Sequence, residues 1–362
     1  MKVLAIDIGA GTQDILLFDS GKQLENCIKL VLPSPSPLLA ARVDALGAEV
    51  EDLYIAGYTI GGGSFSRAIK RFLATGRRVI MTVPAAYSLR NNLDDVAAMG
   101  VEIEVEPTSG RNGAVITADE LDLSALAGLL DAAGESLDGL DAVAVAVQDH
   151  GSYRSGESNR KTRLSHMRRR LETNPDPLAL SYLAGDVPGE FPRMLSAVDR
   201  LREQLSCRHI LVMDTAPAAV AGCLADPRAV ERAGGNLLTI NAGNGHTLAC
   251  LMVAGKVVGL LEHHTKRLEP AAFASYLAAF CRGEARDDDE YMASGHGLFF
   301  IGDPPGMESL DIIAITGPNR GLLEGTGLDI YYPSPGGDMM MTGPMGLVRA
   351  LAYRLGLPQD LA

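Results

Sequence analysis

Two segments of the chain, residues 3–12 and 237–246, carry the same pattern of residue types. In each, a mostly apolar run leads into a carboxylate or its amide, Asp7 in the first and Asn241 in the second, and then into a Gly-x-Gly turn. Apolar runs bounded by glycine predict buried strands with tight turns, because glycine adopts turn conformations that other residues avoid. The bare N–H groups of such turns bind anions, so each segment predicts a site for one phosphate.

The side chains in and beside these turns suggest a role for each copy. Each copy would offer backbone N–H groups and a hydroxyl to one phosphate. The residues are Gly9, Gly11 and Thr12 in the first copy and Gly243, Gly245 and Thr247 in the second. Asp7 ends the first strand where the turn begins, which suits a carboxylate that orders Mg²⁺ through its waters beside phosphates. The alternatives are a turn-capping role for Asp7 and a pair of purely structural hairpins.

The spacing of the two copies predicts how they are used. They are 241 − 7 = 234 residues apart, so one stands near the start of each half of the chain. This is the arrangement expected for a nucleotide held between two lobes.

Composition excludes several classes of partner. The 362 residues are 47% hydrophobic and 21% charged, an ordinary balance for a globular protein with two cores. A formal net charge of −13 disfavours general affinity for nucleic acid or for an anionic membrane surface. No apolar run approaches the ~20 residues of a spanning helix, and the first residues lack a signal-peptide core. We therefore expect a cytoplasmic protein whose five cysteines are reduced thiols.

The apolar pattern divides the chain into lobe I, residues 1–190, and lobe II, residues 191–362. Each lobe contains a predicted three-strand meander, at 2–8, 12–19 and 23–31 and at 236–242, 246–253 and 256–262. Alternating strands and helices follow the first meander and lead to the apolar run 142–147, which predicts a parallel strand buried on both faces. Residues 152–190 break the pattern and are the expected insertion. Lobe II is expected to begin with a helix at 194–205 and a strand at 209–213.

The motifs resemble those of the actin, Hsp70 and sugar-kinase superfamily of two-lobed ATP-binding proteins. Five segments match in order: phosphate motifs at 7–12 and 241–247, connecting helices at 214–222 and 343–350, and the adenosine-site strand and turn at 312–319. The resemblance implies an α/β, two-lobed actin-like or ribonuclease H-like ATPase fold with a duplicated βββαβαβα core. It also implies ATP and Mg²⁺ in the cleft between the lobes, with Gly317 and Asn319 at the nucleotide.

Two carboxylates are candidates for the proton-accepting or water-orienting role in phosphoryl transfer. Asp149 follows the buried run in a segment, residues 148–151, that resembles the Gln-x-His-Gly segment of xylulose-type sugar kinases. Asp214 precedes a connecting helix, where related sugar kinases place their base, but where an Asp also serves as a simple N-cap. We favour Asp149. Asn241 departs from the superfamily, which often has Asp there, and an amide offers the metal no charge and accepts no proton.

Three further features have both a functional and a structural interpretation. The glycine run 61–63 is either a site for a second, acidic substrate or a gating element, or a place of close packing. The basic segment 160–170 is either a solvated helix face or a lid or docking surface for an anionic partner. His263, His264 and His296 lack recognised metal-ligand spacing, so no structural metal site is predicted.

A closer resemblance is to a family of uncharacterised proteins from archaea and anaerobic bacteria, carried by residues 57–63, 81–86 and 92–96. Its members are often labelled as related to pyruvate formate-lyase activating enzyme. A radical S-adenosylmethionine enzyme holds its iron–sulfur cluster with three closely spaced cysteines, whereas the five cysteines here stand singly. The chain is therefore not expected to be such an enzyme, and only a cluster shared across a dimer would rescue that activity.

Two functions remain. The first is a slow ATPase that acts as a nucleotide-dependent switch or activator of a partner protein, which Asn241 favours. The alternative is a small-molecule kinase that transfers the γ-phosphate of Mg-ATP to an unknown acceptor, which Asp149 in its kinase-like segment favours. The expected partners besides the nucleotide are a protein or a small anionic substrate.

Overall fold

The computed structural model describes residues 1–105, 113–153 and 159–358, and its first sheet has the strand order β3-β2-β1-β8-β10-β9. An antiparallel meander forms one half of this sheet: β1 (Lys2–Ile8), β2 (Thr12–Asp19) and β3 (Ile28–Pro33). Two strands parallel to β1 and a short antiparallel edge strand form the other half: β8 (Ala142–Val147), β10 (His209–Met213) and β9 (Ser181–Leu183). Strand β8 is buried along its whole length, as its apolar run predicts.

The second sheet repeats this plan, with the order β14-β13-β12-β11-β15-β16. Its meander consists of β11 (Asn236–Ala242), β12 (His246–Val253) and β13 (Lys256–His264). Strands β15 (Ile312–Thr316) and β16 (Ile330–Tyr331) run parallel to β11, and β14 (Gly297–Phe300) pairs with β13 at the far edge. Three antiparallel strands followed by two parallel strands therefore occur twice, which confirms the predicted duplicated, two-lobed actin-like fold.

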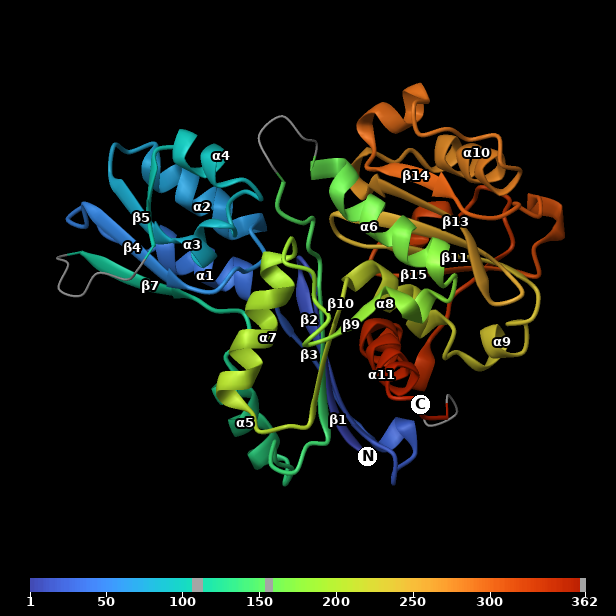
Figure 1. The fold of residues 1–362 in the computed structure, drawn as a ribbon, viewed down its shortest axis with the longest axis horizontal. Coiled ribbons are helices and arrows are strands. Elements are labelled where there is room, and N and C mark those ends of the chain that lie inside the picture. The colour runs from blue at the N-terminus through green and yellow to red at the C-terminus, as the bar shows by residue number, and fades with distance from the viewer. Residues whose placement is uncertain (106–112, 154–158, 359–362) are drawn as a thin grey trace.

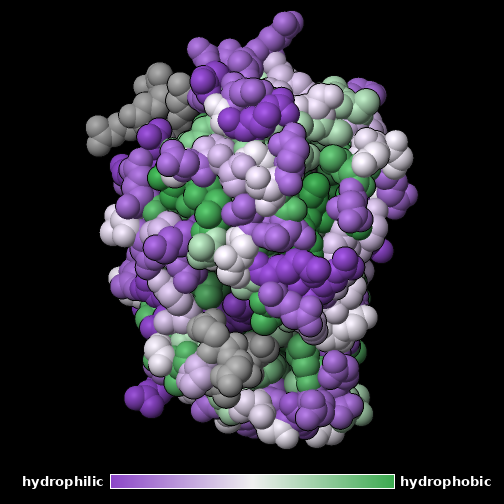
Figure 2. Space-filling model, turned by 90° about the vertical axis from the view of Figure 1, so that its right-hand side faces the viewer, coloured by the Kyte–Doolittle hydropathy of each residue, from purple (hydrophilic) through white to green (hydrophobic). Residues whose placement is uncertain are grey.

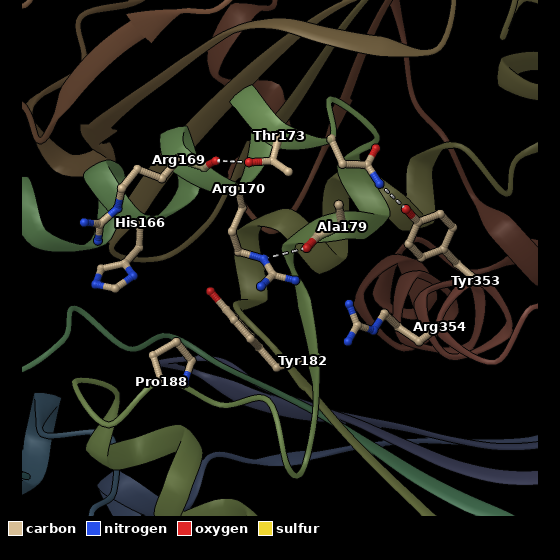
Figure 3. Close-up of a pocket in the computed structure, with 10 residues that line it drawn as sticks. His166, Arg169, Arg170, Thr173, Ala179, Tyr182, Pro188, Tyr353 and Arg354 are labelled. Atoms are coloured by element: carbon tan, nitrogen blue, oxygen red, sulfur yellow. Dashed lines mark hydrogen bonds between the residues drawn. The ribbon is translucent and has the colours of Figure 1, made fainter.

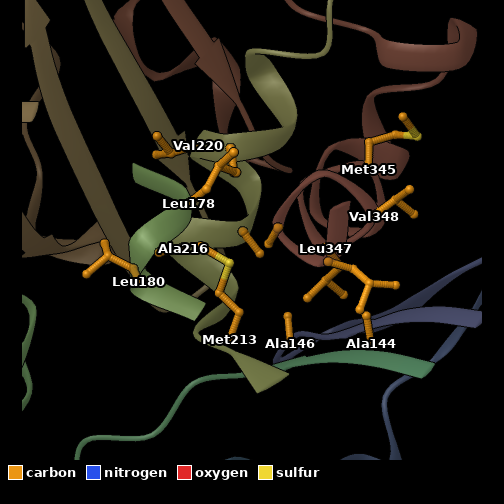
Figure 4. Packing of buried hydrophobic residues seen from close by; sticks show 14 of the residues in the cluster. Ala144, Ala146, Leu178, Leu180, Met213, Ala216, Val220, Met345, Leu347 and Val348 are labelled. Atoms are coloured by element: carbon orange, nitrogen blue, oxygen red, sulfur yellow. The ribbon is translucent and has the colours of Figure 1, made fainter. Parts of the chain in front are cut away.

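Helices α8 (Thr215–Cys223) and α11 (Thr342–Arg354) lie between the two sheets (Figure 1). A hydrophobic core that includes residues of both sheets surrounds them, and Figure 4 shows Leu347 of α11 next to Ala144 and Ala146 of β8. On the outer faces, α5 (Leu123–Ala132) and α7 (Pro192–Gln204) cover the first sheet, and α10 (Pro270–Cys281) covers the second. The molecule is thus built of alternating helix and sheet layers.

A third sheet, of four parallel strands, is inserted between β3 and α5 with the order β6-β5-β4-β7. Its strands are β4 (Asp52–Gly57), β5 (Arg78–Thr82), β6 (Val101–Glu104) and β7 (Ala114–Ala118). Helices α1 (Pro35–Asp44), α2 (Gly63–Leu73), α3 (Val83–Ala86) and α4 (Leu93–Ala98) pack with it around a core of its own. The predicted parallel crossovers are present, but they form a separate subdomain (Figure 1, upper left).

The structure changes three details of the predicted organisation. Helix α7 and strand β10 belong to the first sheet, not to lobe II, because β10 pairs with β8. Strand β3 begins at Ile28, after a short 3₁₀ turn at Leu24–Asn26. Pro33 ends β3 and Pro35 starts α1, where a proline at the first helical position costs no hydrogen bond. Two further helices are α6 (Asn159–Thr173) and α9 (Pro227–Val230).

The surface is mixed in hydropathy. Hydrophilic residues cover most of the face shown in Figure 2, and hydrophobic residues show there in separate patches. None of the helices in the described ranges has the length and apolarity needed to cross a bilayer.

Candidate functional site

A cleft of 830 Å³ lies where the predicted motifs meet. Its lining comes from the hairpin turns of both meanders, the glycine run 61–63, the segment after β8, and the first turn of α11. The carboxyl ends of parallel strands open at one edge of a sheet, which explains why these distant segments converge.

The two hairpin turns have matching backbone geometry. Gly9 N donates to Thr12 O at 2.9 Å, and Gly243 N donates to His246 O at 3.0 Å, in the turns that join β1 to β2 and β11 to β12. The turns also meet each other: a Cβ on Gly11 would lie 2.7 Å from the side-chain nitrogen of Asn244. The predicted pair of facing loops is therefore present, although Gly11 itself does not line the cleft.

The reason for glycine in these turns differs from the one predicted. None of Gly9, Gly11, Gly243 and Gly245 has a left-handed φ. At Gly243 the constraint is steric instead, since a Cβ would lie 2.9 Å from the carbonyl oxygen of His246. Gly245 has open space around it and lines the cleft, so a side chain there would enter the cleft rather than disturb the fold.

Asp7 has a partner that the sequence analysis missed. Asp14 lies directly opposite Asp7 in the β1–β2 register, and both residues line the cleft. The Oδ1 atom of each is buried and has no hydrogen-bond partner among the described residues. Burial raises the pKa of Asp14 to about 7, and burial together with the charges of Asp14 and Asp214 holds the pKa of Asp7 well above its usual value. The hairpin register was the signal that could have found Asp14.

The second hairpin has different side chains at the equivalent positions. Asn241 lies opposite Leu248, where the first hairpin has two carboxylates. Thr247 was predicted to contact a phosphate, but it is fully buried beneath the turn, and its hydroxyl bonds that of Thr265 at 3.0 Å. The residue that matches Thr12 is His246, which lines the cleft. A shift of one position along a strand reverses the face, which is why the Thr247 prediction was wrong.

The predicted adenosine-site residues stand beside the second hairpin. Gly317 follows β15, lines the cleft and has a φ of +94°, a conformation that favours glycine. Asn319 lies outside the lining and instead fixes the hairpin: its backbone N–H donates to Ala242 O and its side chain to Gly243 O, both at 3.0 Å. We find Asn319 in a bracing position, not at the cleft surface.

Asp149, the favoured catalytic candidate, lines the cleft but is already engaged. Its carboxylate accepts hydrogen bonds from the backbone N–H groups of Gly151, Arg193 and Met194, at 2.9, 2.8 and 3.1 Å. Arg193 and Met194 belong to the first turn of α7, so the Asp149 carboxylate accepts hydrogen bonds from free N–H groups at the N-terminus of that helix. Burial raises the pKa of Asp149 to about 6.

Asp214 is held in a buried ionic network that the sequence did not indicate. Arg163 of α6 donates to both oxygens of Asp214, at 2.8 and 2.6 Å, and also to Glu262 of β13. Asp214 in addition accepts from Ala216 N at 3.2 Å, which confirms the N-cap interpretation for α8. All three charged side chains are almost fully buried. Because Asp214 lies outside the cleft lining, its catalytic role has no support from its surroundings.

The glycine run 61–63 forms one wall of the cleft at the start of α2. Gly61 N donates to Glu120 at 2.9 Å, and Glu120 in turn pairs with Arg193 at 2.7 Å. A Cβ on Gly62 would lie 2.2 Å from Ser88 O, so close packing requires glycine here. The structural interpretation of this run is supported, and its place in the cleft also keeps the substrate interpretation open.

The basic segment divides into buried and exposed parts. Arg163 is buried in the network described above, whereas Arg168 is exposed and pairs with Glu172 within the same helix. Arg169 and Arg170 line a second cavity of 470 Å³, shown in Figure 3. Arg170 there donates to Ala179 O at 2.8 Å and lies over the ring of Tyr182. Residues 154–158 before the helix lie outside the described residues.

Four of the seven histidines gather at the cleft, from four separate segments. The group comprises His150, His246, His264 and His296, and we call it the histidine cluster. Ligand nitrogens of three of them, His150, His246 and His296, lie within 4.8 Å of one another. Short, regular spacings do not indicate this cluster, because its members are up to 146 residues apart in the sequence (296 − 150).

The cysteines do not form a reactive group. All five are free thiols, and four of them are buried: Cys27, Cys223, Cys250 and Cys281. Burial raises the pKa of Cys250 and Cys281 to about 12 and keeps both thiols neutral, whereas thiolates are the ligands that iron–sulfur clusters need.

The duplicated sheets, the two helices between them and the facing hairpins give the chain the two-lobed, actin-like fold that the sequence predicts. Residues 60–322 match the family described as "Putative pyruvate format-lyase activating enzyme (DUF1786)", and the chain belongs to this family.

Similarity to characterised proteins is distant. No curated protein sequence matches the chain. Among solved structures, a "PilM-PilN type IV pilus biogenesis complex" chain is 13% identical, with 99% of each chain covered and a TM-score of 0.39. Component A of (R)-2-hydroxyglutaryl-CoA dehydratase from Acidaminococcus fermentans is 11% identical, with 98% of each chain covered and a TM-score of 0.31. Neither similarity assigns an activity to this chain.

Proposed function

We propose that the chain binds Mg-ATP in the cleft between its sheets and hydrolyses it slowly, as a nucleotide-dependent switch or activator of a partner protein. The observation that carries this proposal is the pair Asp7 and Asp14, with unpartnered Oδ1 atoms beside two facing glycine hairpins. Burial raises the pKa of both carboxyl groups, so their ionised forms, which are the forms that bind a metal, are disfavoured until a cation is present.

The residues present fit a magnesium ion. Mg²⁺ prefers one or two carboxylates together with water and phosphate oxygens, and Asp7 and Asp14 offer such a donor set. When bound, the ion would neutralise charge on the phosphates. The backbone N–H groups of the two hairpins would hold those phosphates, and the exposed Lys266 and Arg267 line the same cleft.

Slow hydrolysis is supported by the surroundings of the three residues that the sequence offered for catalysis or for the second lobe: Asn241, Asp214 and Asp149. The second hairpin has Asn241 and Leu248 where the first has two carboxylates. Asp214 is occupied by Arg163, and Asp149 by three backbone N–H groups. Each of these carboxylates would have to give up existing hydrogen bonds before it could take a proton from a nucleophile.

A small-molecule kinase remains the second candidate, because Asp149 lines the cleft beyond the end of β8. The glycine run 61–63 and Arg67 line the same cleft and would be the place for an anionic acceptor. This function requires Asp149 to exchange its helix contacts for the acceptor hydroxyl.

The test is a thermal shift with ATP, ADP, GTP and GDP, each with Mg²⁺. A ligand at 100 times its dissociation constant adds about 2.7 kcal/mol to the free energy of unfolding, so ATP or ADP should raise Tm clearly. Gly245→Val should fold normally and lose the shift, because the new side chain enters the cleft. Gly234→Val, which also has open space but lies outside the cleft lining, should keep it. A parent protein that responds to none of the four nucleotides would refute the proposal.

A further inference from the structure

The histidine cluster is a second site of unusual composition in the same cleft. His150 follows β8, His246 begins β12, His264 ends β13 and His296 precedes β14. The ring centroids of His246 and His296 are 4.5 Å apart, and those of His264 and His296 are 4.4 Å apart. The three other histidines lie elsewhere: His166 packs on Phe191, His209 begins β10, and His263 contacts Tyr291 O.

Three imidazole rings of the histidine cluster are in the neutral form, which has a lone pair available for a metal ion. Burial, the largest cause, lowers the pKa of His246 to about 4 and that of His296 to about 3, and it holds the pKa of His150 well below the ordinary value. These rings are therefore neutral near pH 7, the form in which imidazole binds metals. Arg163 adds a positive charge nearby, but Asp214 and Glu262 pair with it.

Two local observations indicate that the histidine cluster is arranged to bind a ligand. The side-chain oxygen of Gln148 lies 3.0 Å from Nδ1 of His246 and can accept the Nδ1–H, which leaves the lone pair of Nε2 available to a metal ion. Nε2 of His296 is buried and has no hydrogen-bond partner in the described part of the chain. In metal sites, a hydrogen bond to the ring nitrogen that does not bind the metal orients the histidine, as Gln148 does for His246. A buried ring nitrogen without a hydrogen-bond partner costs free energy unless a ligand binds it.

The loop that presents His296 has a fixed conformation. Gly297 has a φ of +139°, and a Cβ on it would lie 2.7 Å from Asp287. A Cβ on Gly295 would lie 2.7 Å from the ring of His263. Both flanking positions therefore require glycine, which holds His296 against the rest of the cluster.

We propose that His150, His246 and His296 bind a divalent transition-metal ion of the zinc type, with His264 beside it. Three imidazoles suit zinc, copper, iron or nickel, and they do not suit Mg²⁺, which prefers oxygen ligands. For a tetrahedral ion with Zn–N distances of about 2.0–2.1 Å, three nitrogens that lie within 4.8 Å of one another need to move together by at most roughly 0.8 Å each.

The proposed site differs from the magnesium site in its ligands and in its dependence on nucleotide. His246 and His150 line the cleft, so a three-histidine ion would keep an open position there for water or an anionic substrate oxygen. The site also joins the lobes, since His150 follows a strand of the first sheet and the other two ligands border the second. The inference does not rest on ATP binding.

The experiment uses the full chain without a polyhistidine tag, stripped with a chelator and then titrated with Co²⁺ and Zn²⁺ in the absence of nucleotide. We expect one ion per chain, visible absorption from bound Co²⁺ that Zn²⁺ displaces, and a higher Tm with Zn²⁺. X-ray absorption of the zinc-loaded parent should show a first shell of imidazole nitrogens. Substoichiometric zinc, or a first shell without imidazole, would overturn the proposal.

Variants locate the site. His246→Gln and His296→Gln should each weaken zinc binding by ~100-fold or more, and Gln148→Ala by ~10–100-fold. His209→Gln, outside the cluster, should bind zinc as the parent does. Asp7→Asn should lose the Mg-nucleotide shift and keep zinc, so failure of the two proposals can be told apart. Unchanged zinc affinity in both folded cluster variants would refute this assignment.

Discussion

At the scale of residues, the cleft contains two groups of opposite chemical character. Asp7 and Asp14 offer hard oxygen donors on the first hairpin, whereas His246 belongs to a cluster of neutral imidazoles at the second. The equivalent positions are related by the same offset: 241 − 7 and 248 − 14 are both 234. The duplicated backbone therefore carries different ligands on its two copies.

Asp14→Asn tests whether the carboxylate pair awaits a cation. In metal-free buffer above pH 7 the variant should be more stable than the parent, by roughly 2 °C or more in Tm, because it removes a carboxyl group whose ionisation burial opposes in the folded state. Mg²⁺ should raise the Tm of the parent and not that of the variant. Asp138→Asn, an exposed substitution outside the cleft, is the control and should respond to Mg²⁺ as the parent does. A variant that is less stable without metal would count against the site.

At the scale of elements, the contact between α8 and α11 determines how the two sheets are joined. A Cβ on Gly222 of α8 would lie 1.6 Å from Thr342 O, and a Cβ on Gly346 of α11 would lie 1.8 Å from Ala218 O. The two helix backbones thus approach each other where neither has a side chain. Small residues in both segments are required by this contact, which the superfamily resemblance anticipated.

Gly222→Ala should destabilise the protein, at the upper end of the ~1–3 kcal/mol usual for overpacking, because the helices must separate to accept one methyl group. Gly128→Ala offers a matched control in the middle of α5. Its Cβ would meet open space, so the exchange should stabilise the protein by ~0.5–1 kcal/mol. Denaturant unfolding of both variants measures the difference. Equal effects of the two substitutions would contradict the close helix contact.

At the scale of the whole molecule, the two lobes are tied together by charges as well as by helices. Arg163 of α6 links Asp214, at the start of α8, to Glu262 in the second sheet. Removing one partner of a buried ion pair leaves the others uncompensated, so this network resists separation of the lobes. A change in the angle between the lobes is the signal that a switch of this architecture would give to a partner.

Asn241→Asp distinguishes a switch from a kinase. In a switch, the substitution should increase ATP hydrolysis, because it gives the second lobe a carboxylate beside the phosphates with little change in volume. In a kinase that uses Asp149, it should matter little, and Asp149→Asn should lower turnover by ~10² or more. Steady-state phosphate release measures both. Parent turnover of roughly 1–100 per second, lost in an Asp149→Asn variant that still binds nucleotide, would exclude the switch.

Features that depend on local residue pattern could be predicted from the amino-acid sequence alone. Alternating and continuous apolar runs specified most strands of both meanders and the buried β8, and the repeated Gly-x-Gly turns placed two equivalent hairpins. These predictions hold because strand pairing across a tight turn is fixed by neighbours in the chain. The same local register contained Asp14 opposite Asp7, although only the paired strands made it evident.

Which distant segments meet is a property of the folded chain as a whole. Pairing with β8 placed β10 in the first sheet, burial turned Thr247 away from the cleft, and α6 brought Arg163 between two carboxylates. The histidine cluster likewise unites residues from four segments that share no spacing rule. Contacts of this kind depend on packing between segments that are far apart in the sequence. They also depend on the face of the strand on which a side chain lies, which a shift of one residue reverses. A short window of sequence specifies neither of them.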